Sequence, residues 1–463
     1  MASDTIVRMK IDPATMSETD RPVYEWLHTH FGCVPQNFCR QLRWRIGWEA
    51  DVEIDGRTQG VLVRGSRGKD VRYPITLHQE AGIHHVMERH GVPAPRVFGM
   101  IENPVAIVME RLPGGINTDL IPDSAVRKQV RHAFIDAMAK LHAVPIEEFA
   151  ALGMNMPRNP RELALNLYQS SIDIARTALA DRPLPLVTFL AKWLEDNVPE
   201  DRHRAAFVTA DAGQFLFDGD RMTGLIDFEV SYIGDPAAEF AGMRLRDTTE
   251  PLGDISELRR YYETITGAAI PHKAIAYHTA GFSGTNTMLM WPMILKPEVQ
   301  NDFIAYLQFT IACSRWSLQG IAESLGIDLD DVAEPEANTT VPFAAATAQL
   351  DALLTGWETS DAGLRFHLEG AAALAAYLER CHVYGGPILA ADLADTTALV
   401  GRTVTTREEA DAAVEAFVGN AAPHQDAALV RFFHRWLARQ NWLLKGCGSQ
   451  AYLTETTLQP IRD

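Results

Sequence analysis

The sequence predicts an α+β protein in which a small antiparallel sheet is followed by a mainly helical region and then by an additional all-α domain. Three observations predict this class: polar and apolar residues alternate between 38 and 65, apolar residues recur at helical spacing from about residue 116, and an Ala-rich helical pattern covers the chain beyond residue 343. The length agrees, because 463 residues correspond to two to four domains of roughly 150 residues.

Composition and charge exclude several classes of function. Apolar residues make up 47% of the chain and charged residues 22%, as in ordinary globular proteins. A formal net charge of −18 argues against non-specific binding to nucleic acid or to an anionic membrane. The five cysteines are scattered without a Cys-x-x-Cys pair, so we expect reduced thiols. Neither a signal peptide nor a membrane span is evident, and we therefore expect a cytoplasmic protein.

The N-terminal part is predicted to carry the sheet. Residues 1–37 are expected to form a lead-in, and residues 38–115 follow in the order β-β-β-α-β-β, which predicts a small antiparallel sheet with one helix packed on it. Alternation around Asp55-Gly56 is typical of a hairpin, and Gly91-Val-Pro-Ala-Pro95 is expected to stop the helix. The predicted elements are a helix at Pro22–His30, a hairpin in Asp51–Arg64, a helix from about Leu77 to His90, and strands at Val97–Met100 and Val105–Glu110.

Residues 116–330 are predicted to be mainly helical, with one β insertion. In Arg127–Ala143, four apolar residues at helical spacing define one face: Val130, Phe134, Met138 and Leu141. The insertion has strands at Ala206–Thr209, Phe215–Phe217 and Met222–Phe228. Further helices are expected at Pro160–Ala180, at Val187–Asn197 and from Ala237 to about Leu325.

The remaining chain is predicted to be a separate α-helical domain, residues 343–463. A polar stretch from Asp331 to Pro342 is typical of a linker. Ala-rich helical patterns then cover Phe343–Leu378 and Arg407–Leu444, with Gly385-Gly386-Pro387 between them.

Polar residues flank the β insertion. Asp211 and Gln214 precede its hairpin and Asp227 follows it, so the hairpin is expected to bring two carboxylates and an amide oxygen together. Oxygen ligands of this type suit Mg²⁺, and a spare carboxylate can orient a hydroxyl nucleophile. Acidic residues beside strands are also ordinary turn formers, and spacing alone leaves both interpretations open. Four histidines of the predicted 77–90 helix lack the spacing of a metal site and are expected at the surface: His78, His84, His85 and His90.

Two segments carry a family resemblance. Leu225-Ile-Asp-Phe-Glu229, followed by Ile233-Gly-Asp-Pro-Ala-Ala-Glu-Phe-Ala241, resembles the signature of the aminoglycoside phosphotransferase-like family of small-molecule kinases. Arg64 stands where that family has the basic residue of its third strand, and Glu80 resembles the helix glutamate that pairs with it. The resemblance extends over residues 38–325 and implies the bilobal protein-kinase-like fold, with a β N-lobe at 38–115 and a helical C-lobe at 116–330.

The resemblance implies an ATP- and Mg²⁺-dependent phosphotransferase acting on a hydroxyl group of a small molecule. Arg64, tethered by Glu80, would hold phosphates, and Asp211 would accept or orient the proton of the hydroxyl. Asp235 resembles an aspartate that braces the catalytic loop. The other implied roles are phosphate covering by Gly47, adenine reading at the hinge by Val108, Met109 and Glu110, and metal binding by Gln214 and Asp227.

The catalytic loop departs from the family pattern. The family has His-Gly-Asp followed five residues later by Asn, whereas Asp211 precedes Gln214 by only three. One interpretation is a shortened loop that still presents Asp211. The other is a degenerate site, and hence a catalytically inactive kinase-fold protein that binds a nucleotide or metabolite and regulates a partner.

The C-terminal domain bears on the substrate. Ala362–Leu374 weakly resembles a small helical protein found beside or fused to one branch of these kinases, a branch that includes acyl-CoA dehydrogenase-linked kinases of hydroxyacyl-CoA thioesters. The domain would then shape the substrate site; alternatively, it buries a flank or forms the interface of a homodimer. The helical lobe has no dense Asp/Glu cluster, which favours a hydroxyacyl-CoA or another largely apolar alcohol over an aminoglycoside. An antibiotic phosphotransferase remains the third alternative.

Overall fold

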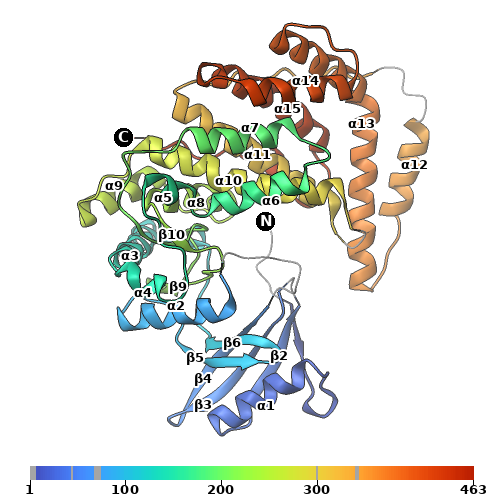
Figure 1. Ribbon diagram of the computed structural model, residues 1–463. Helices are drawn as coiled ribbons and strands as arrows, with labels where there is room; N and C mark the ends of the chain where they lie inside the picture. Colours follow the sequence, from blue (N-terminus) through green and yellow to red (C-terminus); the bar gives the residue numbers. More distant parts are fainter. Residues whose placement is uncertain (1–6, 43–44, 67–74, 299–300, 339–343, 463) are drawn as a thin grey trace. The chain divides into compact units, whose positions relative to one another are not determined.

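The computed structural model describes residues 7–42, 45–66, 75–298, 301–338 and 344–462 (Figure 1). They form two compact units, Met1–Arg158 with His203–Ile270 and Asn159–Arg202 with Pro271–Arg462. The predicted fold class is confirmed, because an antiparallel sheet precedes a helical part with extra helices at the C-terminal end. The predicted boundaries of the lead-in, the lobes and the C-terminal domain stay predictions. No described helix is both long enough and apolar enough to cross a membrane.

Six strands form the antiparallel sheet of the first unit, in the order β1-β2-β3-β4-β6-β5. The predicted hairpin is present as β3 and β4, and Asp55 and Gly56 at its turn have φ of 51° and 74°. Strand β1 is absent from the predicted elements, because four residues are too few to show alternation. The strands and the helices packed on them are β1 (Val7–Lys10), α1 (Asp20–Phe31), β2 (Gln36–Leu42), β3 (Gly47–Ile54), β4 (Arg57–Gly65), α2 (Leu77–Arg89), β5 (Val97–Glu102) and β6 (Val105–Glu110).

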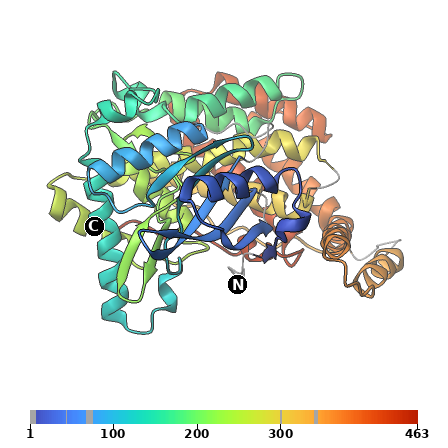
Figure 2. The ribbon, with the colours of Figure 1, turned by 90° about the horizontal axis from the view of Figure 1, so that it is seen from below.

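Alternation along β4 decides which side chains face each helix. Figure 2 shows α1 lying across the strands of the sheet. Val61 and Val63 belong to the core that includes residues of α1, whereas Leu62 packs with Ala81 of α2. Arg64 is two residues from Leu62, so the pleat directs its side chain to the α2 face.

The rest of the first unit surrounds the β insertion. Strands β8 and β9 form its hairpin, and β7 pairs with β10. The predicted apolar face of α3 is confirmed, because its four residues are buried, and Phe134 stacks on Phe215 of β8 with ring centroids 4.6 Å apart. These elements are α3 (Ser124–His142), α4 (Ile146–Ala150), β7 (Ala206–Val208), β8 (Phe215–Asp218), β9 (Arg221–Leu225), β10 (Tyr232–Gly234), α8 (Ala237–Arg246) and α9 (Ile255–Thr266).

All regular secondary structure among the described residues of the second unit is helical, and α10 packs along α11 (Figure 1). Residues 331–338 of the predicted linker have neither helix nor strand, and residues 339–342 lie outside the described residues. The helices are α5 (Pro160–Leu165), α6 (Tyr168–Ala178), α7 (Pro185–Asp196), α10 (His272–Leu295), α11 (Phe303–Leu325), α12 (Ala344–Thr355), α13 (Ala362–Val400), α14 (Arg407–Asn420) and α15 (Asp426–Leu444).

The prediction that Gly385-Gly386-Pro387 separates two helices was wrong, because α13 runs through it. A proline inside a helix leaves the carbonyl four residues earlier without its N–H partner. Here that carbonyl belongs to Val383, and it accepts a hydrogen bond from the backbone N–H of Asn338 at 2.9 Å. The tertiary contact therefore satisfies the group that the proline leaves open.

Candidate active site

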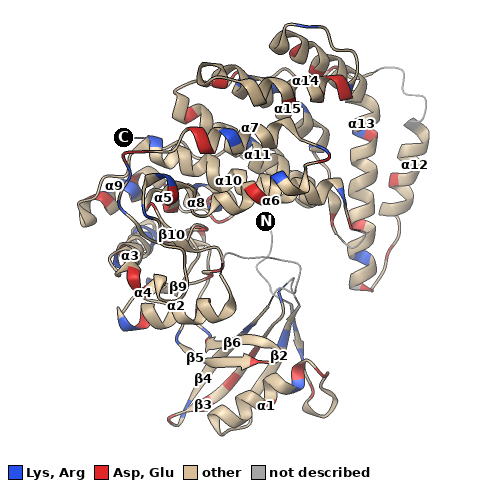
Figure 3. Ribbon diagram, in the orientation of Figure 1, with Lys and Arg blue, Asp and Glu red and all other residues tan. Residues whose placement is uncertain are grey.

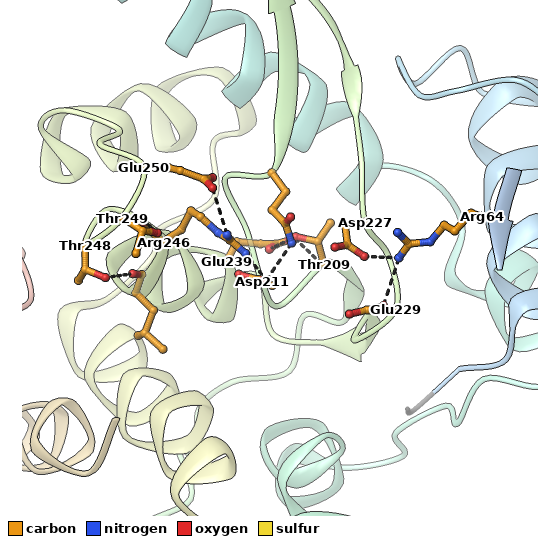
Figure 4. Close-up of polar contacts among 12 residues, drawn as sticks. Arg64, Thr209, Asp211, Asp227, Glu229, Glu239, Arg246, Thr248, Thr249 and Glu250 are labelled. Carbon is orange, nitrogen blue, oxygen red and sulfur yellow. Dashed lines mark hydrogen bonds and ion pairs between the residues drawn. The ribbon is translucent and has the colours of Figure 1, made fainter. Parts of the chain in front are cut away.

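Arg64 lies at the centre of a group of ionised side chains. Its Nε is 3.0 Å from Oε1 of Glu80, which is in the first turn of α2 and only 2% exposed. Its Nη2 contacts Asp227 and lies 3.2 Å from Oε2 of Glu229, which also pairs with Arg45 (Figure 4). We call these five residues the Arg64 cluster. Two arginines face three carboxylates in it, so their formal charges sum to a small negative value.

Burial and charge act in opposite directions on this cluster. Burial favours the neutral form of Glu80 and raises the pKa of its carboxyl, although Arg64 and Arg45 both act to lower it. Burial also works to lower the pKa of the Arg64 guanidinium, but the charges of Asp227 and Glu80 outweigh it and raise that pKa. Arg64 is therefore a permanent cation.

The hairpin brings Gln214 and Asp227 to the same place, as predicted. The register pairs Phe215 with Leu225, and just outside that pair the N–H of Ile226 donates to the carbonyl of Gln214 at 3.1 Å. Asp227 follows with φ of 65°, a left-handed conformation in which aspartate is among the more tolerated non-glycine residues. This conformation lets the chain leave β9 with the carboxylate facing Arg64.

Asp211 lies in a second group of charges. Its Oδ2 accepts a hydrogen bond from Nε2 of Gln214 at 2.8 Å and contacts Nη2 of Arg246, which ends α8 (Figure 4). Arg246 Nη1 is also 3.5 Å from Glu250. We call these four residues the Asp211 cluster. Burial acts to lower the pKa of Arg246, but Asp211 and Glu250, with a contribution from Asp227, raise it. The two clusters are therefore within electrostatic reach of each other.

A buried network braces the loop that carries Asp211. The backbone N–H and the hydroxyl of Thr209 donate to the two carboxylate oxygens of Glu239, each at 2.7 Å. Nε2 of His142 lies 3.2 Å from the same carboxylate, and its Nδ1 is 2.8 Å from the hydroxyl of Tyr262. Asp235, the brace that the resemblance implies, accepts from the N–H of Ala237 at the start of α8. Glu239 is thus a direct contact to the loop.

The loop also needs a glycine opposite it. Ala210 has φ of 62°, and its carbonyl points at α8 so closely that a Cβ on Gly242 would lie 1.8 Å from the carbonyl oxygen. Only glycine permits this approach. Neither Arg246 nor Gly242 could be identified from the sequence, because both act through contacts with a loop more than 30 residues away.

The other predicted site residues lie on the sheet. Gly47 pairs with Arg64 across β3 and β4, and a Cβ there would be 3.2 Å from the carbonyl oxygen of Val63. Val108 and Met109 are buried in β6 beside β4, so their side chains are core. Glu110 ends β6, with its N–H donating to the carbonyl of Arg96 at 2.8 Å. The hydrogen bonds and ion pairs of the described residues include none between the side chains of Val108, Met109 or Glu110 and either cluster.

One prediction about histidine was wrong. His84 is 3% exposed, its Nδ1 lies 3.0 Å from the carbonyl oxygen of Pro95, and its ring meets the edge of Phe228. Burial lowers the pKa of His84 from 6.5 to about 4, so this residue is neutral at physiological pH. The sequence shows only its place on a helix, whereas the packing of Pro95 and Phe228 around it decides its burial.

The donor set fits a magnesium ion bound together with a nucleotide. Nowhere in the described chain do three or more His, Cys, Asp and Glu side chains group as a metal site on their own. Asp227 offers a carboxylate, and Gln214, whose amide nitrogen is used by Asp211, offers an amide oxygen. Proteins usually bind Mg²⁺ through one or two carboxylates plus substrate phosphates, so two protein ligands suffice.

Comparisons with known proteins agree with this geometry. Residues 45–272, which include both clusters, match the sequence model of the phosphotransferase enzyme family, APH. A candidate aminoglycoside phosphotransferase from Ralstonia eutropha has a similar structure, with a TM-score of 0.50 and 15% identity over 66% of this chain and 98% of its own. No curated protein sequence matches the chain.

Two further solved structures are similar at lower scores. The streptomycin–ATP complex of APH(2")-IIa has a TM-score of 0.45 and 14% identity over 68% of this chain and 98% of its own. An ethanolamine kinase from Plasmodium vivax has a TM-score of 0.45 and 10% identity over 62% and 81%. The fold assignment rests on the Ralstonia structure: the chain has a protein-kinase-like fold, and residues 45–272 of it match the APH family model.

Proposed function

We propose that the chain is an ATP- and Mg²⁺-dependent phosphotransferase that phosphorylates a hydroxyl group of a small molecule. The observation that carries the proposal is that the two ends of the β8–β9 hairpin come together. Asp227 at one end pairs with Arg64, which also holds Glu80, and Gln214 at the other end donates a hydrogen bond to Asp211. Phosphoryl transfer needs few covalent steps from the protein, and a site of positioned charges is what it requires.

Each residue has a role that follows from its place. Arg64 is the cation held by Glu80 for the phosphates, while Asp227 and Gln214 supply oxygen ligands for the metal. Asp211 orients the acceptor hydroxyl and takes up its proton. When bound, ATP supplies the phosphoryl group, and Mg²⁺ neutralises charge on its phosphates. Gly47 would let the backbone approach phosphate, and Val108–Glu110 would present the hinge to adenine.

The acceptor that we favour is a hydroxyacyl-CoA or another largely apolar alcohol. Support comes from the composition of the helical region, which has no dense acidic cluster for a polycation, and from the resemblance of Ala362–Leu374 to partners of such kinases. One observation favours a second candidate, an inactive nucleotide- or metabolite-binding protein: Asp211 is paired with Arg246, which competes with a substrate hydroxyl for the carboxylate.

Turnover with a panel of acceptors tests the proposal. Purified protein is incubated with ATP, with and without Mg²⁺, and with hydroxyacyl-CoAs, alcohols, sugars and aminoglycosides, while ADP release and nucleotide affinity are measured. We expect ADP release that requires both Mg²⁺ and an acceptor, and a loss of about 1,000-fold or more in kcat for Asp211→Asn with nucleotide binding retained.

The matched control is Asp51→Asn, which removes a carboxylate that pairs with Arg111 in the sheet, away from both clusters. It should leave turnover unchanged. If wild type and Asp211→Asn bind nucleotide equally and neither turns over any acceptor, the inactive binding protein is the correct function.

A further inference from the structure

Helix α12 is apolar but not buried. Its 12 residues, AAATAQLDALLT, include one charged side chain, Asp351, and Figure 3 shows the helix neutral elsewhere. None of its described side chains is buried, and Leu350 and Leu353 are 45% and 50% exposed. Eight of its 12 residues are Ala or Leu, and a helix with this much apolar surface is normally covered by protein.

Helix α13 adds an exposed seam beside α12. Four leucines expose 37% to 51% of their surface, and at 100° per residue they fall within about 80° of arc. The seam extends along about 38 Å of the helix. Its positions recur at intervals of three and four residues, as in helices that pair: Leu364, His367, Ala371, Leu374, Leu378, His382, Gly385 and Leu389.

The seam lacks formal charge. None of its eight positions is Lys, Arg, Asp or Glu, and the run Gly370–Leu378 is uncharged throughout. Two copies of an acidic chain would repel each other over most of their surfaces, but these segments can meet without burying like charges. Ala371 and Gly385 are small enough to let a facing helix come close.

The turn between α12 and α13 carries an exposed tryptophan. Trp357 is 66% exposed and borders an open groove of about 720 Å³, which is also lined by Leu354, Leu368 and Ala372. Glu358, Arg365 and Glu369 also line this groove, so its rim is charged while Trp357 itself is apolar. Exposed aromatic side chains are enriched at protein interfaces.

We propose that the α12–α13 hairpin is the surface through which two copies of this chain form a dimer. An antiparallel helical hairpin with one neutral seam is half of a four-helix bundle, and a two-fold axis supplies the other half from the same surface. The exposed parts of the leucines and Trp357 amount to on the order of 600 Å² per copy. With the alanines beside them, the contact approaches the roughly 800 Å² per partner of a stable interface.

Molar mass in solution tests this proposal independently of catalysis. Light scattering after size exclusion, and sedimentation velocity over a range of concentrations, should give twice the 51.3 kDa of one chain. Leu374→Glu combined with Leu378→Glu should raise the dissociation constant by about 100-fold or more and yield monomers. Both side chains are exposed, so circular dichroism and Tm should not change. Leu374→Gln with Leu378→Gln is the milder pair if the charged one lowers expression.

The control is Leu120→Glu, which makes one substitution of the same kind at a leucine that is 77% exposed in the first unit. It should remain a dimer. A wild-type chain that is monomeric at all concentrations overturns the proposal, and it does so even if the α12–α13 hairpin binds a different protein. A dimer that survives the seam substitutions overturns it as well.

Discussion

Replacing Arg64 with methionine tests the electrostatics of the site through stability. The substitution keeps an apolar stem of similar length but leaves Glu80, whose side chain is 3% exposed, without the cation 3.0 Å away. Removing one partner of a buried ion pair destabilises proteins by about 3–5 kcal/mol. Arg45 still acts on Glu80, so we expect the lower end of that range, about 3 kcal/mol, at pH 8.

The free energy of unfolding that Arg64→Met loses should become smaller as the pH falls. Burial raises the pKa of Glu80 above its unfolded value already in the wild type, and the loss of Arg64 removes the largest influence that lowers it. A carboxyl with a raised pKa binds its proton more tightly in the folded state, so its effect on stability improves as pH falls toward the unfolded pKa. Arg64→Met should therefore approach wild-type stability between pH 8 and about 5. Adding Glu80→Gln should recover about 1–2 kcal/mol at pH 8.

Chemical denaturation at several pH values measures both effects. The matched control is Arg40→Met, which breaks a pair with Asp20 at 3.1 Å in which the arginine is 24% exposed. Asp20 is also buried, but it keeps hydrogen bonds from Nε1 of Trp48 and from the hydroxyl of Ser17, so the control should lose only about 1 kcal/mol. The reasoning is refuted if Arg64→Met is no less stable than Arg40→Met, or if its deficit is the same at every pH.

Three other substitutions address the loop and the buried histidine. Arg246→Gln should lower kcat by at least about 10-fold with unchanged nucleotide affinity, since it removes the guanidinium that holds Asp211 in place. Gly242→Ala should destabilise the fold by more than about 3 kcal/mol in urea, because its Cβ would lie 1.8 Å from a carbonyl oxygen of the loop. Lowering the pH from 7 to 4 should reduce the free energy of unfolding of the wild type by up to about 3 kcal/mol through His84. The reason is that the depressed pKa of His84 makes the unfolded state bind a proton that the folded state does not. In His84→Leu, this part of the pH dependence of stability should be missing.

Each of these has a control or an outcome that would contradict it. Arg259→Gln removes an arginine that also has an i,i+4 glutamate partner, Glu263, and this variant should keep its kcat. Gly370→Ala, where no atom lies within 4 Å of the new Cβ, should be neutral or stabilising. An Arg246→Gln enzyme with full kcat, or a stability slope that is unchanged by His84→Leu, would contradict the respective prediction.

The fold could be predicted in detail because local patterns carry it. The alternation in β3 and β4, the apolar face of α3 and the hairpin before Asp227 each need only neighbouring residues. The two wrong predictions, at Pro387 and His84, have a common cause in tertiary contacts. Pro387 stays within a helix because the N–H of Asn338 satisfies the carbonyl of Val383, and His84 is buried because Pro95 and Phe228 pack against it. None of these three partners belongs to the same helix as the residue that it contacts.

By itself, the sequence determined the α+β class, the order of most elements and the residues that would flank the hairpin, because propensity, pleat and turn chemistry act over a few residues. Only the tertiary structure decided how those residues are paired. Arg64 meets Glu80 because the pleat of β4 faces α2, and Asp211 meets Arg246 because α8 packs on the loop through Gly242. An ion pair forms only when its two groups lie within about 4 Å, and only the packed chain fixes distances at that scale.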